Sequence, residues 1–148
     1  MIANQQNVAR LQQITQKLNG RTQFSTTDNI QNPSVYYIEK GESMINKEKL
    51  CAQAAEIGIE LDETALERLD KYAEYLVEVN KSVNLTRITE PEDIAVKHFF
   101  DSMTLLTAYE VPQNAAVADV GTGAGFPGMV LKICRPDIDL KMQNLNAD

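Results

Sequence analysis

The sequence predicts an α/β fold in which a helical region is followed by the first part of a parallel sheet. Two observations support this prediction. Apolar residues recur at helical spacing between Asp62 and Asn80. Further on, a short apolar run at residues 115–118, of the kind found in strands buried on both faces, leads into a glycine-rich loop at 121–128. A helix is expected after the loop and a second strand from Ile138, which together make a β-α-β unit.

Local signals mark the ends of the first two expected helices. Asn46 can cap a helix that runs to about Ile57, with Gly58 as its stop. Asp62 can cap a second helix, whose acidic side chains between residues 62 and 78 are expected on a solvated face. Its buried face is expected to contain Leu66, Leu69, Ala73, Leu76, Val77 and Asn80, widened by Tyr72, Tyr75 and Val79.

A third helix is expected to begin at Thr89, whose hydroxyl would form a capping box with Glu92. This helix carries His98, the single histidine of the chain, and Asp101 lies three residues further on. On an α-helix this spacing places both side chains on one face, where a hydrogen bond would raise the affinity of the imidazole for a proton. A structural pair at the helix end and a functional pair both fit this pattern.

The loop at residues 121–128 is the segment most indicative of function. Its glycines permit positive φ and a close approach of the main chain to a ligand, and Pro127 fits the first turn of the next helix. The spacing from the strand is poor for a dinucleotide, and no Gly-Lys-Ser/Thr follows as in a P-loop. Asp119 at the strand end favours S-adenosylmethionine, whose ammonium and sulfonium charges suit a carboxylate. A nicotinamide dinucleotide and a glycine turn without a ligand remain alternatives.

Four segments resemble a known family in order and spacing. They are NLT (84–86), IAVKHFFDS (94–102), DVGTGAGFPG (119–128) and LKI (131–133). The chain resembles the bacterial small-subunit rRNA methyltransferase G family, also called glucose-inhibited division protein B. The resemblance runs from about Met44 to about Asp139, roughly two thirds of the chain.

This resemblance implies a Rossmann-like class I methyltransferase fold and transfer of a methyl group from S-adenosylmethionine to N7 of a guanine in 16S ribosomal RNA of the small ribosomal subunit. It implies no catalytic base, because guanine N7 carries a lone pair and no proton. The residues expected to bind the cofactor are Asp119, Gly121, Gly123, Gly125 and Phe126. The residues expected to line the pocket are Asn84, His98, Asp101 and Ser102.

Composition limits the other functions. Residues 44–148 carry ten basic and eighteen acidic side chains, a net charge of −8, so any contact with RNA must come from a local patch. One histidine without clustered cysteines or carboxylates gives no ligand set for a metal ion. No apolar stretch of 18 residues and no leader occur, so we expect a cytoplasmic protein. Cys51 and Cys134 are expected as reduced thiols among apolar neighbours.

Three segments are expected along the chain. Residues 1–43, rich in Gln and Asn, are expected to be a disordered or non-native extension, with Met44 as the native start. Residues 44–110 form the helical region, and residues 111–148 form the start of the cofactor-binding domain, which we expect to be truncated. The resemblance implies an acidic residue at the end of the second strand, where Asn144 stands. A methyltransferase that is impaired or inactive is therefore expected, and the alternatives are a non-catalytic helical interaction module and a nicotinamide-dependent oxidoreductase.

Overall fold

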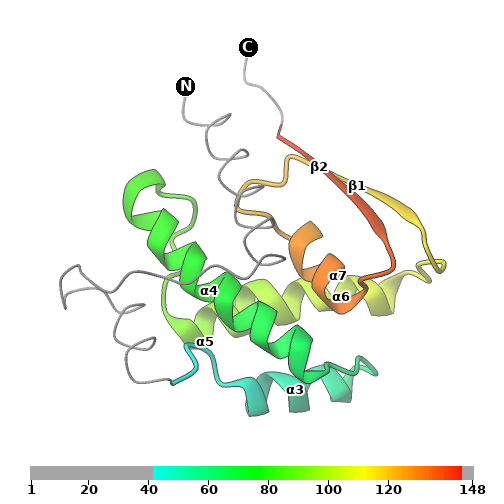
Figure 1. The fold of residues 1–148 in the computed structure, drawn as a ribbon, viewed down its shortest axis with the longest axis horizontal. Coiled ribbons are helices and arrows are strands. Elements are labelled where there is room, and N and C mark those ends of the chain that lie inside the picture. The colour runs from blue at the N-terminus through cyan, green and yellow to red at the C-terminus, as the bar shows by residue number, and fades with distance from the viewer. Residues whose placement is uncertain (1–41, 145–148) are drawn as a thin grey trace.

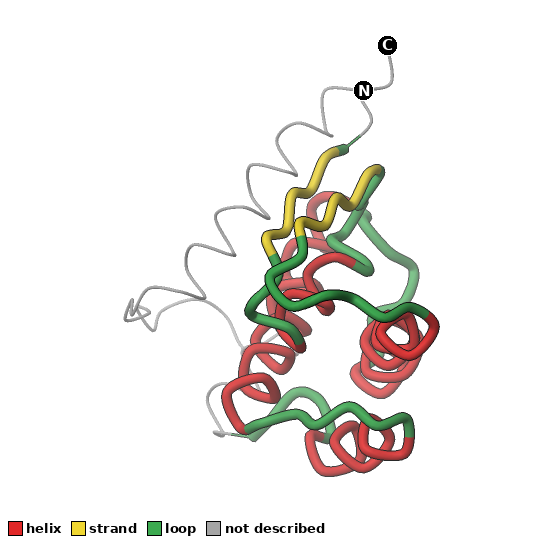
Figure 2. Tube along the Cα trace, turned by 90° about the vertical axis from the view of Figure 1, so that its right-hand side faces the viewer, coloured by secondary structure: helices red, strands yellow, loops and turns green. Residues whose placement is uncertain are grey.

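The computed structural model describes residues 42–144, so the predicted extension at 1–43 lies almost wholly outside the described residues. The described chain consists of five helical segments, a strand, a further helix and a second strand. In order they are α3 (Lys47–Glu56), α4 (Glu63–Val83), α5 (Pro91–Asp93), η1 (Ile94–Phe100), α6 (Asp101–Ala108), β1 (Ala116–Val120), α7 (Gly128–Cys134) and β2 (Asp139–Gln143). In both views the two strands lie at one end of the described part of the molecule, and α3 lies at the other end (Figure 1, Figure 2).

The first two helices begin where the sequence predicts. The Asn46 side chain accepts a hydrogen bond from the Lys49 N–H at 2.9 Å, and the Asp62 side chain accepts one from the Ala65 N–H at 2.7 Å. Each cap satisfies one of the N–H groups that a helix leaves unpaired at its start. Gly58, at φ +79°, follows the end of α3, as expected of a residue that stops a helix.

The Asp62 cap gives a direct stability prediction. We expect Asp62→Ala to lower the free energy of unfolding by about 1 kcal/mol, because the Ala65 N–H loses its partner. Asp62→Asn keeps an acceptor at the same place and is expected to remain close to the parent. Urea unfolding followed by circular dichroism measures both variants, and equal losses for Ala and Asn would contradict the assigned cap.

The third helix differs from the prediction in its start and in its pitch. Helix α5 begins at Pro91 with Glu90 at the N-cap, and no side chain caps it, so the predicted Thr89 capping box is wrong. Glu92 instead pairs with Lys49 of α3 at 2.9 Å. The chain then continues as the π-helix η1 before α6 resumes the α-helical pitch. Because a π-helix bonds residue i to i+5, it changes which side chains share a face.

One acidic residue of α4 is also an exception to the predicted solvated face. The Asp70 side chain is buried, and its carboxylate accepts a hydrogen bond from the Ile45 N–H at 2.9 Å. Lys47 lies 3.8 Å from the same carboxylate. Burial raises the pKa of Asp70, although the Ile45 N–H and Lys47 act in the opposite direction. Asp70 therefore links the segment that leads into α3 to helix α4 by a hydrogen bond.

The two strands are parallel, as predicted, and pair from Ala116 with Asp139 to Val120 with Gln143. The prediction that β1 is buried on both faces is wrong. Its side chains alternate between exposed and half-buried, and Val120 is 58% exposed. The reason is that α7 covers one face of the sheet while the other face carries no described element.

Helix α7 joins the sheet to the helical region. It contacts α4 and α6 as well as β2, and its apolar residues belong to the same core as those of the N-terminal helices. The members of this core from beyond residue 120 are Ala124, Met129, Val130 and Ile133. One continuous core therefore sets the position of the glycine loop, which immediately precedes α7, relative to α4.

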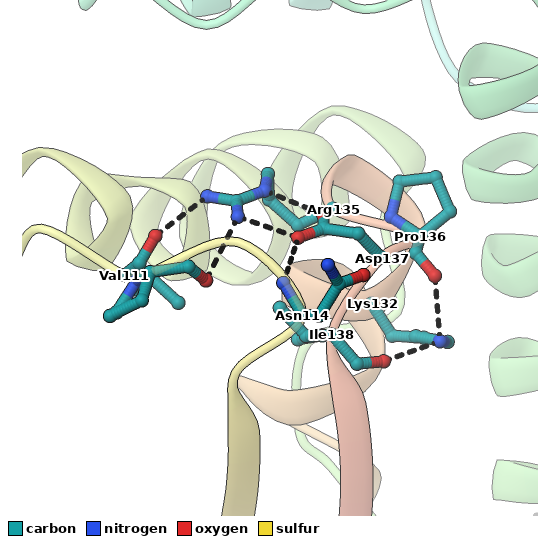
Figure 3. A network of polar contacts seen from close by, with 8 residues as sticks. Val111, Asn114, Lys132, Arg135, Pro136, Asp137 and Ile138 are labelled. Carbon is teal, nitrogen blue, oxygen red and sulfur yellow. Dashed lines mark hydrogen bonds and ion pairs between the residues drawn. The ribbon is translucent and has the colours of Figure 1, made fainter.

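A polar network lies at the end of the β-α-β unit where both strands begin (Figure 3). The Arg135 guanidinium pairs with the Asp137 carboxylate at 2.7 Å and donates to the carbonyl oxygens of Val111 and Pro112. Asp137 also accepts from the Asn114 N–H at 2.9 Å. The network ties the segment before β1 to the turn before β2, and it lies at the opposite end of the strands from the glycine loop.

Candidate functional site

The glycine loop follows β1 and has the backbone conformation that its sequence predicts. Gly121, Gly123 and Gly125 have φ values of +80°, +56° and +101°. Residues with side chains rarely adopt these values, so glycine is favoured here. The Gly121 N–H donates to the Gln143 carbonyl at 2.6 Å, and the Gly125 N–H donates to the Thr122 carbonyl at 2.8 Å. The loop is thus a compact turn anchored to the end of β2.

Asp119 organises the junction between β1 and α7. Its Oδ2 accepts a hydrogen bond from the Gly128 N–H at 3.0 Å. The approach is so close that a Cβ on Gly128 would lie 2.5 Å from the same oxygen. One oxygen of the Asp119 carboxylate, which was predicted to face a ligand, therefore accepts a hydrogen bond from the first residue of α7. The second oxygen, Oδ1, accepts nothing from the described residues and is not fully buried.

Phe126 lies among aromatic rings from the helical region. Its ring stacks on His98, with centroids 4.3 Å apart and planes inclined by 8°, and on Tyr72 at 5.3 Å. Phe99 adds a tilted contact at 6.1 Å. Phe126 was predicted to pack against a ligand, and its observed contacts join the loop to α4 and η1.

The His98 imidazole is held by Thr86. Its Nε2 lies 3.0 Å from Thr86 Oγ1, which accepts the Ile88 N–H at 3.1 Å. The Thr86 hydroxyl accepts from the Ile88 N–H and can donate its own proton to His98 Nε2. In that arrangement the imidazole proton of His98 is on Nδ1. Burial lowers the pKa of His98, and the nearby Asp101 charge acts in the opposite direction. The predicted rise in proton affinity is therefore wrong, because desolvation outweighs Asp101.

The other predicted pocket residues lie apart from the loop contacts. Asn84 is exposed and forms the left-handed cap at the end of α4, with φ +55°. Asp101 is exposed on α6 and makes no hydrogen bond to His98 among the described residues. Ser102 of α6 is buried, and its hydroxyl donates to the His98 carbonyl of the preceding helix η1. Of the four predicted pocket residues, only His98 has a hydrogen bond or ring contact with the loop among the described residues, through its stacking on Phe126.

Sequence reasoning missed three residues that shape the site. Asn80, placed on the apolar face of α4, accepts the Thr86 N–H at 2.8 Å and so holds the segment that bonds His98. Thr86 was noted only as part of a motif. Tyr72 was placed in the core, but its hydroxyl donates to the Ala124 carbonyl at 2.7 Å. A polar tip on a buried tyrosine, which needs a partner, was the signal available in the sequence.

Polar groups at the loop fit a small polar ligand. The N–H groups of Thr122 and Ala124 donate to no described residue, although both residues are buried. Asn144 Oδ1 accepts the Gly123 N–H at 3.1 Å, and its Nδ2 is buried without a partner in the described chain. These donors belong to the loop or to Asn144, which bonds the loop, and oxygen acceptors of a bound molecule could accept from them.

Two other kinds of site are not seen in the described residues. Between residues 42 and 144, no three or more His, Cys, Asp or Glu side chains are grouped so that they could hold a metal ion. None of the helices in the same range has the length and apolarity needed to cross a membrane. Cys51 and Cys134 are both free, and burial raises the pKa of Cys134 to about 12.

Together the fold and the loop limit the class of protein. A carboxylate near the end of a strand, a loop with three glycines at positive φ, a helix and a second parallel strand are consistent with the first part of an α/β methyltransferase fold. Residues 65–145 match the family described as GidB, rRNA small subunit methyltransferase G. The match covers more than half of the 148 residues, and the chain belongs to this family. The resemblance predicted from the four sequence segments is confirmed.

Curated relatives agree with the family. A ribosomal RNA small subunit methyltransferase G of Desulforamulus reducens is 49% identical over 94 residues, which cover 63% of this chain and 39% of the relative. Its counterpart in Pelotomaculum thermopropionicum is 47% identical over 89 residues, 60% of this chain and 37% of the relative. The enzyme of the same name from Bacillus mycoides is 44% identical over 98 residues, which cover 66% of this chain and 41% of the relative. The chain spans about two fifths of the length of these relatives.

Proposed function

We propose that the loop at residues 121–128 binds S-adenosylmethionine and that the chain belongs to an enzyme that methylates guanine N7 in 16S ribosomal RNA, in the cytoplasm. The observation that carries the cofactor is the loop itself, with three glycines at positive φ and two backbone N–H groups without a described partner. The names of the relatives support ribosomal RNA of the small subunit as the substrate.

The roles of the loop residues follow from their contacts. The free N–H groups of Thr122 and Ala124 are placed to bind a carboxylate such as that of a methionine moiety. Asp119 Oδ1 is the acceptor available for an ammonium group, while Oδ2 holds α7 in place. Asn144 Nδ2 is a donor available for a ribose oxygen. When bound, S-adenosylmethionine would supply the electrophilic methyl group.

The remaining chemistry asks for positioning. Guanine N7 has an in-plane lone pair and no proton to lose, so we assign no catalytic base. A target nitrogen at about 3 Å from the methyl carbon reacts because of proximity and orientation. His98, stacked on Phe126 and bonded to Thr86, is a neutral group of fixed orientation beside the loop. Its Nδ1 bonds no described residue and is not fully buried, so we propose that it lines the target-base side of the pocket. Asn84, Asp101 and Ser102 are proposed for the border of that pocket.

We further propose that a polypeptide of these 148 residues binds the cofactor weakly, because Asn144 offers the ribose one donor where a carboxylate would accept from both hydroxyls. Titration of the ¹⁵N-labelled chain with S-adenosylhomocysteine, followed by NMR, measures this. We expect shifts in the amide signals of residues 121–128 and a Kd weaker than micromolar. NAD⁺ serves as the matched control and should leave these signals unchanged. A micromolar Kd would overturn the weak-binding proposal, and equal shifts with NAD⁺ would overturn the choice of cofactor.

A further inference from the structure

Tyr72 connects the helical region to the glycine loop. It lies in the middle of α4, where its side chain is 1% exposed. Its ring stacks on Phe99 at 5.5 Å and on Phe126 at 5.3 Å. Its hydroxyl donates to the Ala124 carbonyl at 2.7 Å, across 52 positions of sequence. One side chain thus packs in the core and bonds the loop.

This hydrogen bond matters because it joins the loop to the helical region, whereas the other hydrogen bonds of the loop among the described residues lie within it or run to β2, Asn144 and α7. Within the described chain, Tyr72 is the one side chain of residues 42–110 that hydrogen-bonds the loop between Gly121 and Pro127. Glycine restricts the neighbouring peptide planes less than other residues do, so the orientation of each plane in the loop depends on its hydrogen bonds. In the Ala124–Gly125 peptide plane the Gly125 N–H bonds the Thr122 carbonyl, and the Tyr72 hydroxyl adds a second bond at the Ala124 carbonyl, next to the Ala124 N–H.

The fit between Tyr72 and the loop is close. A Cβ on Gly125 would lie 2.5 Å from the Tyr72 hydroxyl oxygen, so the loop passes directly over the phenol. Burial and the nearby Asp119 carboxylate both raise the pKa of Tyr72, so the phenol keeps its proton and always donates. The Tyr72 hydroxyl is therefore a permanent donor to the Ala124 carbonyl of the loop.

We propose that Tyr72 is a positioning residue of the cofactor loop, whose hydroxyl holds the Ala124–Gly125 peptide in the orientation that ligand binding requires. The inference rests on the proposed function, because it assigns Tyr72 a part in cofactor binding. A role in packing alone makes a different prediction. If Tyr72 served packing alone, a phenylalanine in its place would keep the ring contacts to Phe99 and Phe126 and would leave ligand binding unchanged.

Tyr72→Phe in the full 148-residue chain separates the two roles. We expect the Gly125 amide signal to shift in the ligand-free protein and the loop amides to exchange faster with solvent, because the Ala124 carbonyl loses its donor. We expect the Kd for S-adenosylhomocysteine to weaken about fivefold to tenfold, as measured by NMR titration. The control is Tyr109→Phe, since Tyr109 is 71% exposed and far from these contacts in sequence.

The outcomes distinguish this inference from the proposed function. If neither parent nor variant responds to S-adenosylhomocysteine, the proposed cofactor is wrong, and faster exchange in Tyr72→Phe still supports a loop-positioning role. If the parent binds and Tyr72→Phe matches it in Kd, Gly125 signal and exchange, the Tyr72 inference is overturned.

A second variant pair guards against misfolding. Gly125→Ala should be less damaging in the Tyr72→Phe background, where the 2.5 Å conflict with the hydroxyl is gone, and equal damage in both backgrounds would count against the assigned contact.

Discussion

Gly128→Ala is expected to lower the free energy of unfolding by about 3 kcal/mol or more, a large share of the stability of a small domain. The added Cβ would lie 2.5 Å from Asp119 Oδ2 and 3.0 Å from Asp119 Cβ. Either the carboxylate or the start of α7 must move, and the hydrogen bond from the Gly128 N–H to Asp119 is then lost. Urea unfolding measures the loss, and NMR signals of residues 121–128 report whether the loop moves with it.

The sign of this effect runs against helix propensity, which makes the prediction specific. Alanine is favoured over glycine inside a helix by about 1 kcal/mol, so an isolated helix would gain from the change. The cost must therefore come from Asp119. In an Asp119→Ala background the conflict with the carboxylate disappears and the 3.0 Å contact with Cβ remains, so the cost of Gly128→Ala should fall sharply. An unchanged cost in that background would show that Asp119 is not the cause.

The parts of the fold that local sequence encodes were predicted correctly. Asn46 and Asp62 cap helices because an oxygen near the N–H three residues ahead is a local arrangement. The positive φ of the loop glycines and the parallel pairing of the two strands were likewise predicted. In each case the residues that determine the structure are neighbours in sequence or belong to one β-α-β unit.

The predictions that failed depend on tertiary contacts. Thr89 and Glu92 fit a capping box, but Glu92 finds Lys49 of a helix more than forty positions away. The spacing of His98 and Asp101 assumed an α-helix, whereas the segment is a π-helix, and the pKa of His98 follows from its burial beside Phe126. Tyr72 has the spacing of a core residue, and only the fold brings its hydroxyl to Ala124.

Asn144→Asp is expected to strengthen S-adenosylmethionine binding by about tenfold or more, if the proposed cofactor is correct. Asn144 Oδ1 already accepts the Gly123 N–H at 3.1 Å, and an aspartate can keep that bond. The change replaces the buried, unpartnered Nδ2 with an acceptor oxygen. A carboxylate there could accept from both ribose hydroxyls, and a hydrogen bond to a charged group contributes about 1.5–3 kcal/mol. NMR titration of both proteins with S-adenosylhomocysteine, which has the same ribose, gives the ratio of Kd values.

A matched control separates position from charge. Gln143→Glu adds the same negative charge one residue earlier, on an exposed side chain of β2, and should leave the Kd within about twofold because exposed charges interact weakly. Asn144→Ala removes the bond to Gly123 and should weaken binding below the parent. If Gln143→Glu and Asn144→Asp strengthen binding equally, general electrostatics accounts for the gain. If Asn144→Asp binds no better than the parent, the end of β2 does not face the ribose, and the placement of the cofactor along the loop is wrong.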